Sequence, residues 1–499
     1  MIYFIISIIL IVKFLLLKKA SSTAVDQYFW LKYRDRVKTQ KVCPPDLPEY
    51  ILEVKQWYPP LFGWFLSKIS DNIFQYTHIF TQLLSLFRLS LIFIVSYILH
   101  IEFSFSLFLA IIVYLTAPIL IYYDNQINSR IFGAILVDIL VLLFWGYFEY
   151  NLYYLFFPIA IFTVILLFTH KMSHQLYLFL LMGLSIYYFS IVPIATYILS
   201  NIIAIYFFNY KNYLKHHIEI VKFWHRNRYK LGSHQFYESD IYGKEGFVYG
   251  NRLHGDGIKS FIKKSYLLIG MLPFSIFVLF NFELNFFGIV ILMTLIFILL
   301  TSFVDYFLCL GAGSLYNYNL VTFIGFYLIY TDIDYSLLKN QILLFIVFLM
   351  TFFSIYKFYK SLISKQNDKE LNSAINFLKE SNLNRVMVIP FQLPDEIAYK
   401  TGKSVFWGGH GYGFLWLERY FPVFNTKIEE AINDWNLGTV FLKKEYFPEF
   451  FKKVDMDLFH TEFENEKYII LSIKRWKNQK RIPQWAIEKY PDIFGKDNV

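Results

Sequence analysis

The stretch Val25-Asp26-Gln27-Tyr28-Phe29-Trp30 follows the first apolar segment of the chain, Met1–Leu17, and places Asp26 nine residues beyond that segment. The second long apolar segment begins only near Leu83, and Tyr58-Pro59-Pro60-Leu61-Phe62 lies shortly before it. A carboxylate this close to a membrane surface, followed by an aromatic and proline-rich element that turns the chain back, can hold a reactive group at a bilayer interface.

The composition predicts a polytopic membrane protein. Of 499 residues, 56% are hydrophobic, and the mean hydropathy of +0.42 is well above that of soluble proteins. The net charge of +9 is concentrated in a few polar loops and in the C-terminal third. This distribution fits anionic lipid headgroups or phosphate-bearing substrates better than nucleic acid. The two cysteines provide no disulfide framework.

Apolar runs long enough to cross a bilayer fill most of the first 360 positions. We expect about eleven spans, counting two within 176–208 because Pro193 divides that region. The other nine runs lie near 2–18, 83–99, 104–122, 131–147, 152–168, 266–282, 286–303, 318–331 and 341–358. Residues 1–362 therefore predict a transmembrane domain with two long polar loops, 18–82 and the basic, amphipathic 209–265.

Residues 366–499 predict a small soluble α/β domain, because strand and helix patterns alternate along them. The strand patterns are 385–390, 404–407, 439–442 and 468–473, and the helical patterns are 368–382, 394–401 and 426–435. The Gly-rich stretches Gly311–Tyr316 and Gly408–Gly413 lack the Lys-Ser/Thr ending of a phosphate-binding loop, so we interpret both as turns.

The sequence gives conflicting indications of which side of the membrane the Asp26 loop faces. With an odd number of spans, an outer Asp26 loop implies that 123–130, 169–175, 209–265 and the C-terminal domain are also outside. The positive-inside rule prefers the reverse, but it weakens for long loops, where most of these basic residues lie. We expect a multi-pass protein of a bacterial inner or cell membrane, with an extracytoplasmic C-terminal domain.

Two carboxylates are candidate catalytic residues. Asp26 can accept a proton from an attacking group, or it can merely cap a helix over Gln27–Arg36. Asp124, followed by Arg130, lies between the third and fourth spans on the same face as Asp26, where a plain interfacial loop is the alternative. A third acid, Asp138, lies within a span. The first interpretation is that it pairs with a group on another helix, and the alternative is that it forms part of a proton or ion path.

Basic residues on that face are candidate phosphate ligands. Lys171 and His174 lie in one short loop, where interfacial anchoring is the alternative and a metal pair is disfavoured. The long loop 209–265 is basic, aromatic and amphipathic, which suits either a grip on an anionic headgroup or a plain interfacial helix. Its candidate residues are His225, Arg226, Arg252 and His254.

The order of these parts resembles the integral-membrane glycosyltransferases of the GT-C fold. That group includes the protein O-mannosyltransferases, the aminoarabinose transferases and the oligosaccharyltransferases. The resemblance rests on the first span, on Asp26 beyond it, on Tyr58-Pro59-Pro60-Leu61-Phe62, on a second acidic loop, and on the soluble C-terminal domain. Its local motif is confined to about residues 20–65, whereas the order of the parts covers the whole chain.

The resemblance implies an inverting glycosyltransferase that moves a sugar from a polyprenyl-phosphate donor to a lipid, glycan or protein acceptor at the non-cytoplasmic face. In that group the first-loop Asp contacts the acceptor nucleophile, so this role falls to Asp26, and the second-loop acid corresponds to Asp124. Tyr58, Arg130, Lys171, His174 and the basic residues of 209–265 would bind the donor phosphate. Asp26 is followed by Gln27 rather than by an acid or a His. We therefore predict an enzyme without a metal or other cofactor.

Two other classes of protein compete with this interpretation. A transporter or flippase for a lipid-linked or anionic solute would carry charges deep inside several spans and a repeat between its halves. Only Asp138 is clearly mid-span in the sequence, and no repeat is visible. A non-catalytic membrane scaffold with a partner-binding C-terminal domain is the third class.

Overall fold

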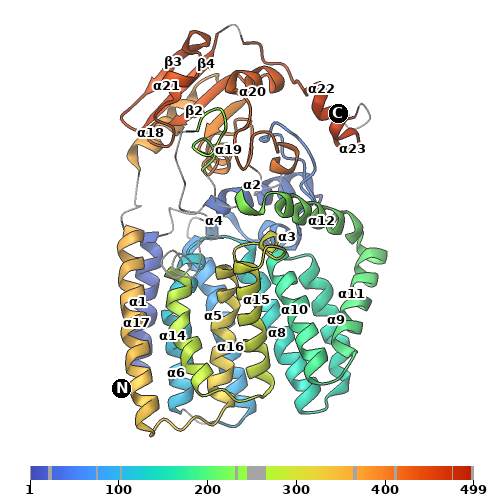
Figure 1. Ribbon diagram of the computed structural model, residues 1–499, viewed down its shortest axis with the longest axis vertical. Coiled ribbons are helices and arrows are strands. Elements are labelled where there is room, and N and C mark those ends of the chain that lie inside the picture. Colours follow the sequence, from blue (N-terminus) through green and yellow to red (C-terminus); the bar gives the residue numbers. More distant parts are fainter. Residues whose placement is uncertain are drawn as a thin grey trace.

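The computed structural model describes residues 2–20, 25–74, 77–101, 104–230, 234–243, 266–363, 368–408, 413–474 and 476–495. Its lower part is a bundle of helices, and its upper part is a smaller domain around a β-sheet (Figure 1). Helices α2 (Val25–Gln40), α3 (Leu61–Ser67) and α12 (Tyr210–Arg226) lie between the two parts. The polar loops of the sequence therefore form the layer that joins bundle and sheet.

A helix lies at each of the eleven positions where the sequence predicts a span. They are α1 (Ile2–Ala20), α5 (Thr77–Ile98), α6 (Phe105–Thr116) continued by α7 (Pro118–Tyr123), α8 (Ser129–Glu149), α9 (Phe156–Leu167), α10 (Lys171–Tyr187), α11 (Val192–Phe208), α14 (Tyr266–Phe280), α15 (Phe286–Phe303), α16 (Asn317–Tyr330) and α17 (Leu338–Ile363). Pro193 lies in the first turn of α11, where the missing N–H of proline costs no helical hydrogen bond.

Eleven spans are not confirmed. Within the described residues, four helices are long and apolar enough to cross a membrane: α5, α8, α15 and α17. A fifth span results if α11 and α12 count as one, but they meet at an angle of 120°. Apart from α1, which has 19 residues, the remaining bundle helices are apolar but shorter. A helix of 17 residues, such as α10 or α11, rises only about 25 Å at 1.5 Å per residue.

A buried ion pair joins helices of the bundle. The guanidinium of Arg88 in α5 forms an ion pair with Asp138 in α8, and both side chains are fully buried. Arg88 also donates a hydrogen bond of 2.9 Å from Nη1 to the backbone oxygen of Tyr318 in α16. The pair thus joins three helices, and it supports helix pairing as the role of the mid-span Asp138.

The upper domain contains a four-stranded mixed sheet in the order β1-β2-β4-β3. β1 (Val386–Ile389) and β2 (Thr439–Lys443) are parallel, whereas β4 (Tyr468–Ile473) is antiparallel to both β2 and β3 (Phe459–Glu464). Helices α18 (Lys369–Glu380), α19 (Pro394–Thr401) and α20 (Ile428–Trp435) match the predicted helical patterns. The shorter helices of the chain are α4 (Asp71–Phe74), α21 (Phe450–Lys453), α22 (Gln484–Lys489) and α23 (Pro491–Phe494).

Two segments from the polar loops belong to the core of this domain. Ile51 and Leu52 of the first loop, and Phe236 and Tyr242 of the second, are buried in the same hydrophobic cluster as the sheet residues. The backbone of the first loop also extends the sheet, because the N–H of Ile51 donates to the oxygen of Val405 at 2.9 Å. The upper domain is therefore assembled from three distant parts of the chain.

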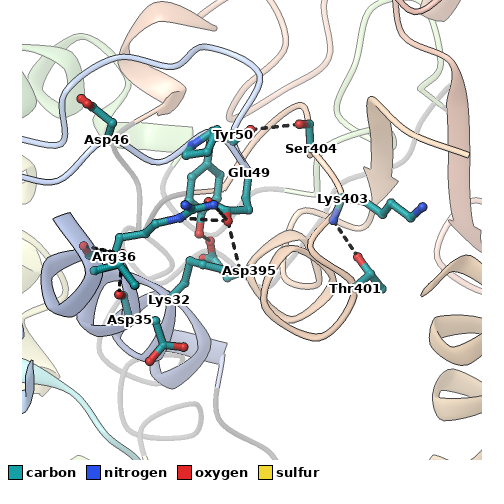
Figure 2. A network of polar contacts seen from close by, with 12 residues as sticks. Lys32, Asp35, Arg36, Asp46, Glu49, Tyr50, Asp395, Thr401, Lys403 and Ser404 are labelled. Carbon is teal, nitrogen blue, oxygen red and sulfur yellow. Dashed lines mark hydrogen bonds and ion pairs between the residues drawn. The ribbon is translucent and has the colours of Figure 1, made fainter. Parts of the chain in front are cut away.

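Helix α2 is bound to the upper domain by a buried polar network (Figure 2). Lys32 and Arg36 of α2 both contact the carboxylate of Glu49, with Lys32 Nζ at 3.2 Å from Oε1. The hydroxyl of Tyr50 donates a hydrogen bond of 2.6 Å to Asp395 in α19. These contacts fix the position of the helix that carries Asp26.

We expect replacement of Glu49 by Gln to lower the free energy of unfolding by roughly 1–3 kcal/mol near neutral pH, because two charge-assisted contacts are lost. Burial alone would raise the pKa of Glu49, but Arg36 and Lys32 outweigh it and hold the pKa below its ordinary value. Such a group stabilises the fold above the unfolded pKa, and this contribution disappears as the pH falls through the folded pKa.

The difference in thermal unfolding midpoint between wild type and E49Q should therefore shrink below about pH 4. The matched control is Glu445→Gln, since the side chain of Glu445 is 79% exposed and also pairs with a lysine, Lys443. An equal difference in midpoint between wild type and E49Q at pH 7 and at pH 3.5 would contradict the stabilising role of the Glu49 carboxylate.

Candidate functional site

A cavity of about 250 Å³ lies where the bundle meets α2, α12 and the upper domain. Four of the residues predicted from the sequence line it, namely Asp26, Tyr58, Arg130 and Lys171. They come from four separate segments of the chain: α2, the loop before α3, the start of α8 and the start of α10. The fold therefore brings a carboxylate, a phenol and two cations to one place.

The start of α8 and the start of α10 approach closely because Gly133 has no side chain. A Cβ at Gly133 would lie 2.5 Å from Ser173 Oγ and 2.8 Å from His170 Cβ. His170 caps α10, since its Nδ1 accepts a hydrogen bond of 3.3 Å from the N–H of Ser173. This contact places Arg130 and Lys171 on the same cavity.

Arg130 is the second residue of α8, and its guanidinium lies 4.4 Å from the ring centroid of Tyr123. Its Nη1 is 3.8 Å from the sulfur of Met172. Its buried Nε has no hydrogen-bond partner among the described residues. A buried donor of this kind is costly unless a ligand satisfies it, so Arg130 is suited to bind an anion.

Lys171 is the first residue of α10, and its side chain is buried against Tyr58, with Nζ 5.0 Å from the ring centroid. Tyr58 is itself buried and contacts Trp30 of α2, edge to face, at 5.4 Å between ring centroids. Burial raises the pKa of the Tyr58 hydroxyl, and the nearby carboxylate of Asp26 raises it further. Tyr58 is therefore a neutral hydrogen-bonding group beside the two cations.

Asp26 lies in the first turn of α2 and is partly exposed to the cavity. The helix begins at Val25, so Asp26 is inside it rather than its cap. Carboxylates are favoured in the first turn, because the helix dipole is positive there. Asp26 therefore presents a carboxylate to the cavity, which suits a group that accepts a proton or a hydrogen bond.

No protein-family model matches this sequence, and no curated protein matches it either. A solved structure of the archaeal oligosaccharyltransferase AglB from Archaeoglobus fulgidus, in complex with an inhibitory peptide and a dolichol-phosphate, is similar to the chain. The similarity has a TM-score of 0.50 at 8% sequence identity and covers 98% of this chain and 77% of that chain.

The fold is GT-C-like. At this sequence identity the similarity concerns the fold alone. The similarity in fold and the apolar helices together support an integral membrane protein. The GT-C-like bundle and the sheet domain meet at the cavity of Asp26, since Phe414 of the upper domain also lines it.

Asp124 lies outside this cavity, within the core of the GT-C-like bundle. Its carboxylate accepts hydrogen bonds of 2.6 Å from Ser85 Oγ and of 2.6 Å from the hydroxyl of Tyr318. The ammonium of Lys13 in α1 lies 3.6 Å from Asp124 Oδ2, and both side chains are buried. Asp124 thus contacts α1, α5 and α16, and its catalytic role remains a prediction.

The other histidines and arginines that the sequence predicted as phosphate ligands do not line the Asp26 cavity as described. His174 lies behind the cavity wall, where Nε2 contacts the hydroxyl of Tyr197 and the ring lies 5.6 Å from that of His217. Arg226 at the end of α12 binds Glu418 of the upper domain through Nε and Nη2, each at 3.2 Å. The ring of His225 lies 6.2 Å from that of Tyr306. Arg252 and His254 are outside the described residues.

Several cavity residues were not predicted as site residues. His217 and Trp224 come from α12, and Gln175 from α10; the Gln175 side chain lies 3.0 Å from His217 Nε2. The turn predicted at Gly311 also reaches the cavity, and its φ of +111° favours glycine. A helical wheel of the amphipathic segment 210–226 would have placed His217 and Trp224 on one face, whereas no local signal points to Gly311 or Phe414.

Among the described residues, no group of three or more His, Cys, Asp or Glu side chains is positioned to hold a metal ion. The possible metal donors that line the cavity are one carboxylate, the thiol of Cys309 and two histidines, His170 and His217, and His170 already caps α10. The metal-independent reaction expected from the sequence remains a prediction.

Proposed function

We propose that the chain is an inverting glycosyltransferase that moves a sugar from a polyprenyl-phosphate donor to an acceptor at the non-cytoplasmic membrane face. The observation that carries the proposal is the cavity in which Asp26 faces the same space as Arg130 and Lys171. The GT-C-like fold supports it, and so does the neighbour AglB, which was solved with a peptide and a dolichol-phosphate.

Asp26 is the group that activates the acceptor in this proposal. Its carboxylate accepts the proton, or the hydrogen bond, of the attacking hydroxyl or amide as the new bond to the anomeric carbon forms. The bond between that carbon and the phosphate oxygen breaks on the opposite face, and the polyprenyl phosphate leaves with the bonding electrons. Attack from the opposite face inverts the anomeric carbon.

Arg130 and Lys171 stabilise the departing phosphate. Negative charge develops on the phosphate oxygens as the glycosidic bond breaks, and cations held in a site with little water stabilise such charge strongly. The helix starts that carry these two side chains are positioned before the substrate arrives, since Gly133 and the His170 cap hold the starts of α8 and α10 together. Tyr58 contributes a neutral hydroxyl on the same wall.

The competing transporter is supported less well. A transporter uses buried charges along a pathway, but four of the buried charges in the described part of the bundle pair with one another, Lys13 with Asp124 and Arg88 with Asp138. None of the four lines the Asp26 cavity as described. Their arrangement favours a structural role in joining helices.

The donor site is tested by replacing Lys171 with Met, which keeps the length of the side chain and removes its charge. We expect the variant to bind polyprenyl phosphate about 10- to 100-fold more weakly, because one charge-assisted contact is lost. Binding is measured with the protein in lipid nanodiscs, by quenching of intrinsic tryptophan fluorescence.

Lys211→Met is the matched control, because Lys211 lies on α12 and is exposed. It should bind polyprenyl phosphate as the wild type does. Equal affinities of K171M and the wild type would remove Lys171 from the proposed site, and no measurable binding by the wild type would refute the proposed donor.

A further inference from the structure

A second and larger cavity, of about 740 Å³, lies on the other side of α12. Its walls are the first loop from Asp46 to Trp57, the exposed side of α12 around Lys215 and Glu219, and the C-terminal segment from Lys480 to Phe494. This volume lies within the range of roughly 300–1,000 Å³ that is typical of ligand sites. We call it the α12 cleft.

The α12 cleft adjoins the Asp26 cavity. Consecutive residues of α12, His216 and His217, line the cleft and the cavity respectively, and so do Trp57 and Tyr58 of the first loop. Trp416 lines the cleft and Phe414, two residues earlier, lines the cavity. The cleft and the Asp26 cavity therefore share α12 and the first loop as a common wall.

The charges of the cleft are nearly balanced. Four carboxylates line it, from Asp46, Glu53, Glu219 and Asp492, together with three lysines, Lys55, Lys215 and Lys480. One of these pairs is already joined, with Lys480 Nζ at 2.8 Å from Glu53 Oε2. The Asp26 cavity, by contrast, has two strong cations for one carboxylate. The cleft therefore suits a neutral ligand with many hydroxyls, since carboxylates accept and ammonium groups donate hydrogen bonds to hydroxyls.

Two indoles add apolar surface to this polar lining. Trp57 is held edge to face against Tyr213 of α12 at 5.2 Å, and Trp416 against Tyr490 at 5.1 Å between ring centroids. Aromatic faces fixed in this way cover the C–H faces of sugar rings while hydroxyls reach the polar groups around them. Aromatic and carboxylate groups together are thus the surface that a carbohydrate requires.

A polypeptide fits the cleft less well. An extended peptide binds by adding a strand to an exposed sheet edge, and an amphipathic helix binds in an apolar groove. The described walls are loops and helices rather than strands, and charged side chains are spread over all of them. The cleft thus offers neither a row of backbone partners nor a continuous apolar surface.

We infer that the α12 cleft binds a neutral oligosaccharide, which serves as the acceptor. The inference rests on the proposed function, because it names the acceptor of the Asp26 site. Because the cleft adjoins the Asp26 cavity along α12 and the first loop, one end of the bound chain would lie nearest to Asp26.

Saturation-transfer NMR on the full-length protein in nanodiscs tests the inference. The probes are neutral trisaccharides of glucose, mannose, galactose and N-acetylglucosamine, and a decapeptide rich in Ser, Thr and Asn. We expect at least one trisaccharide to bind, and Trp57→Ala and Glu219→Gln each to weaken it at least about tenfold. Trp64→Ala is the control, because Trp64 is 47% exposed and lines neither cavity.

E219Q should fold like the wild type, since it changes neither side-chain length nor shape. Thermal unfolding midpoints are measured for all variants to verify that they are folded. Absence of binding for every trisaccharide, or unchanged binding in both W57A and E219Q, would overturn the inference. Binding of the decapeptide that E219Q weakens would assign the cleft to a polypeptide and overturn it as well. If a trisaccharide binds while polyprenyl phosphate does not, the proposed donor reaction fails and the carbohydrate specificity of the cleft stands.

Discussion

Asp26→Asn should lower the rate of sugar transfer at least about 100-fold, because positioned proton acceptors contribute roughly 10²- to 10⁴-fold to such reactions. The amide keeps the shape of the side chain but cannot accept the proton of the acceptor. Asp26 lies in the first turn of α2, and the position of that helix is set by Lys32, Arg36 and Glu49. The substitution should therefore leave the fold unchanged.

Transfer is measured as the release of polyprenyl phosphate from lipid-linked sugars extracted from the host membranes, with the purified protein in nanodiscs. Asp35→Asn is the matched control, since Asp35 lies on the same helix and its side chain is 44% exposed. It should retain wild-type turnover. Turnover by D26N close to that of the wild type would remove Asp26 from the reaction.

A second large effect is expected at the centre of the bundle. Arg88→Met should lower the free energy of unfolding by roughly 3–5 kcal/mol, because it leaves the buried carboxylate of Asp138 without its cation. Both side chains are fully buried, and Arg88 also binds the backbone of Tyr318. The cost therefore combines an unpaired charge with a lost helix contact.

The double replacement R88M/D138L should recover most of this loss, because apolar residues of similar size can replace a buried pair without leaving a charge. Thermal unfolding midpoints in nanodiscs provide the measurement, and Lys339→Met is the control, since Lys339 is exposed at the start of α17. A midpoint of R88M equal to that of the wild type would show that the ion pair does not stabilise the bundle. Recovery in the double variant would separate the unpaired charge from the lost packing.

Helices and strands were largely predictable from the sequence, because hydropathy and periodicity are local signals. The strands β1, β2 and β4 and the helix α19 lie within one residue of their predicted bounds. Strand β3 was missed, since its residues are mostly exposed and include two glutamates, and it is defined by pairing with β4. The predicted strand at 404–407 is only a bridge at Val405, between Tyr50 and Val386.

The candidate site was predictable only in part, for a geometric reason. Chain order and span parity indicate which loops share a face of the membrane, so Asp26, Arg130 and Lys171 could be grouped. They do not indicate how each helix is rotated about its axis. Asp124 belongs to the same face by parity, yet its side chain is turned into the bundle toward Lys13 and Tyr318.

The membrane spans show the limit of composition as evidence. Among the described residues, apolar runs predicted the bundle helices, but four of these helices meet the length and hydropathy expected of a full crossing. The broken helices α6 and α7, separated at Ala117 before Pro118, cannot be distinguished from one long helix by hydropathy. A proline inside an apolar run is compatible with one long helix and with two broken ones, because membrane helices tolerate proline.

The contact between Tyr50 and Asp395 joins residues 345 positions apart in the chain. Ribosomes add about 5–20 residues per second, so roughly 20–70 s pass between the synthesis of the two partners. During this time the first polar loop exists without the sheet that later buries Ile51 and Leu52. A nascent chain that ends before β1 would leave α2 without its contacts to the upper domain. The first polar loop therefore exposes apolar residues until the C-terminal part of the chain has been synthesised, and such exposed residues are typical binding sites for chaperones.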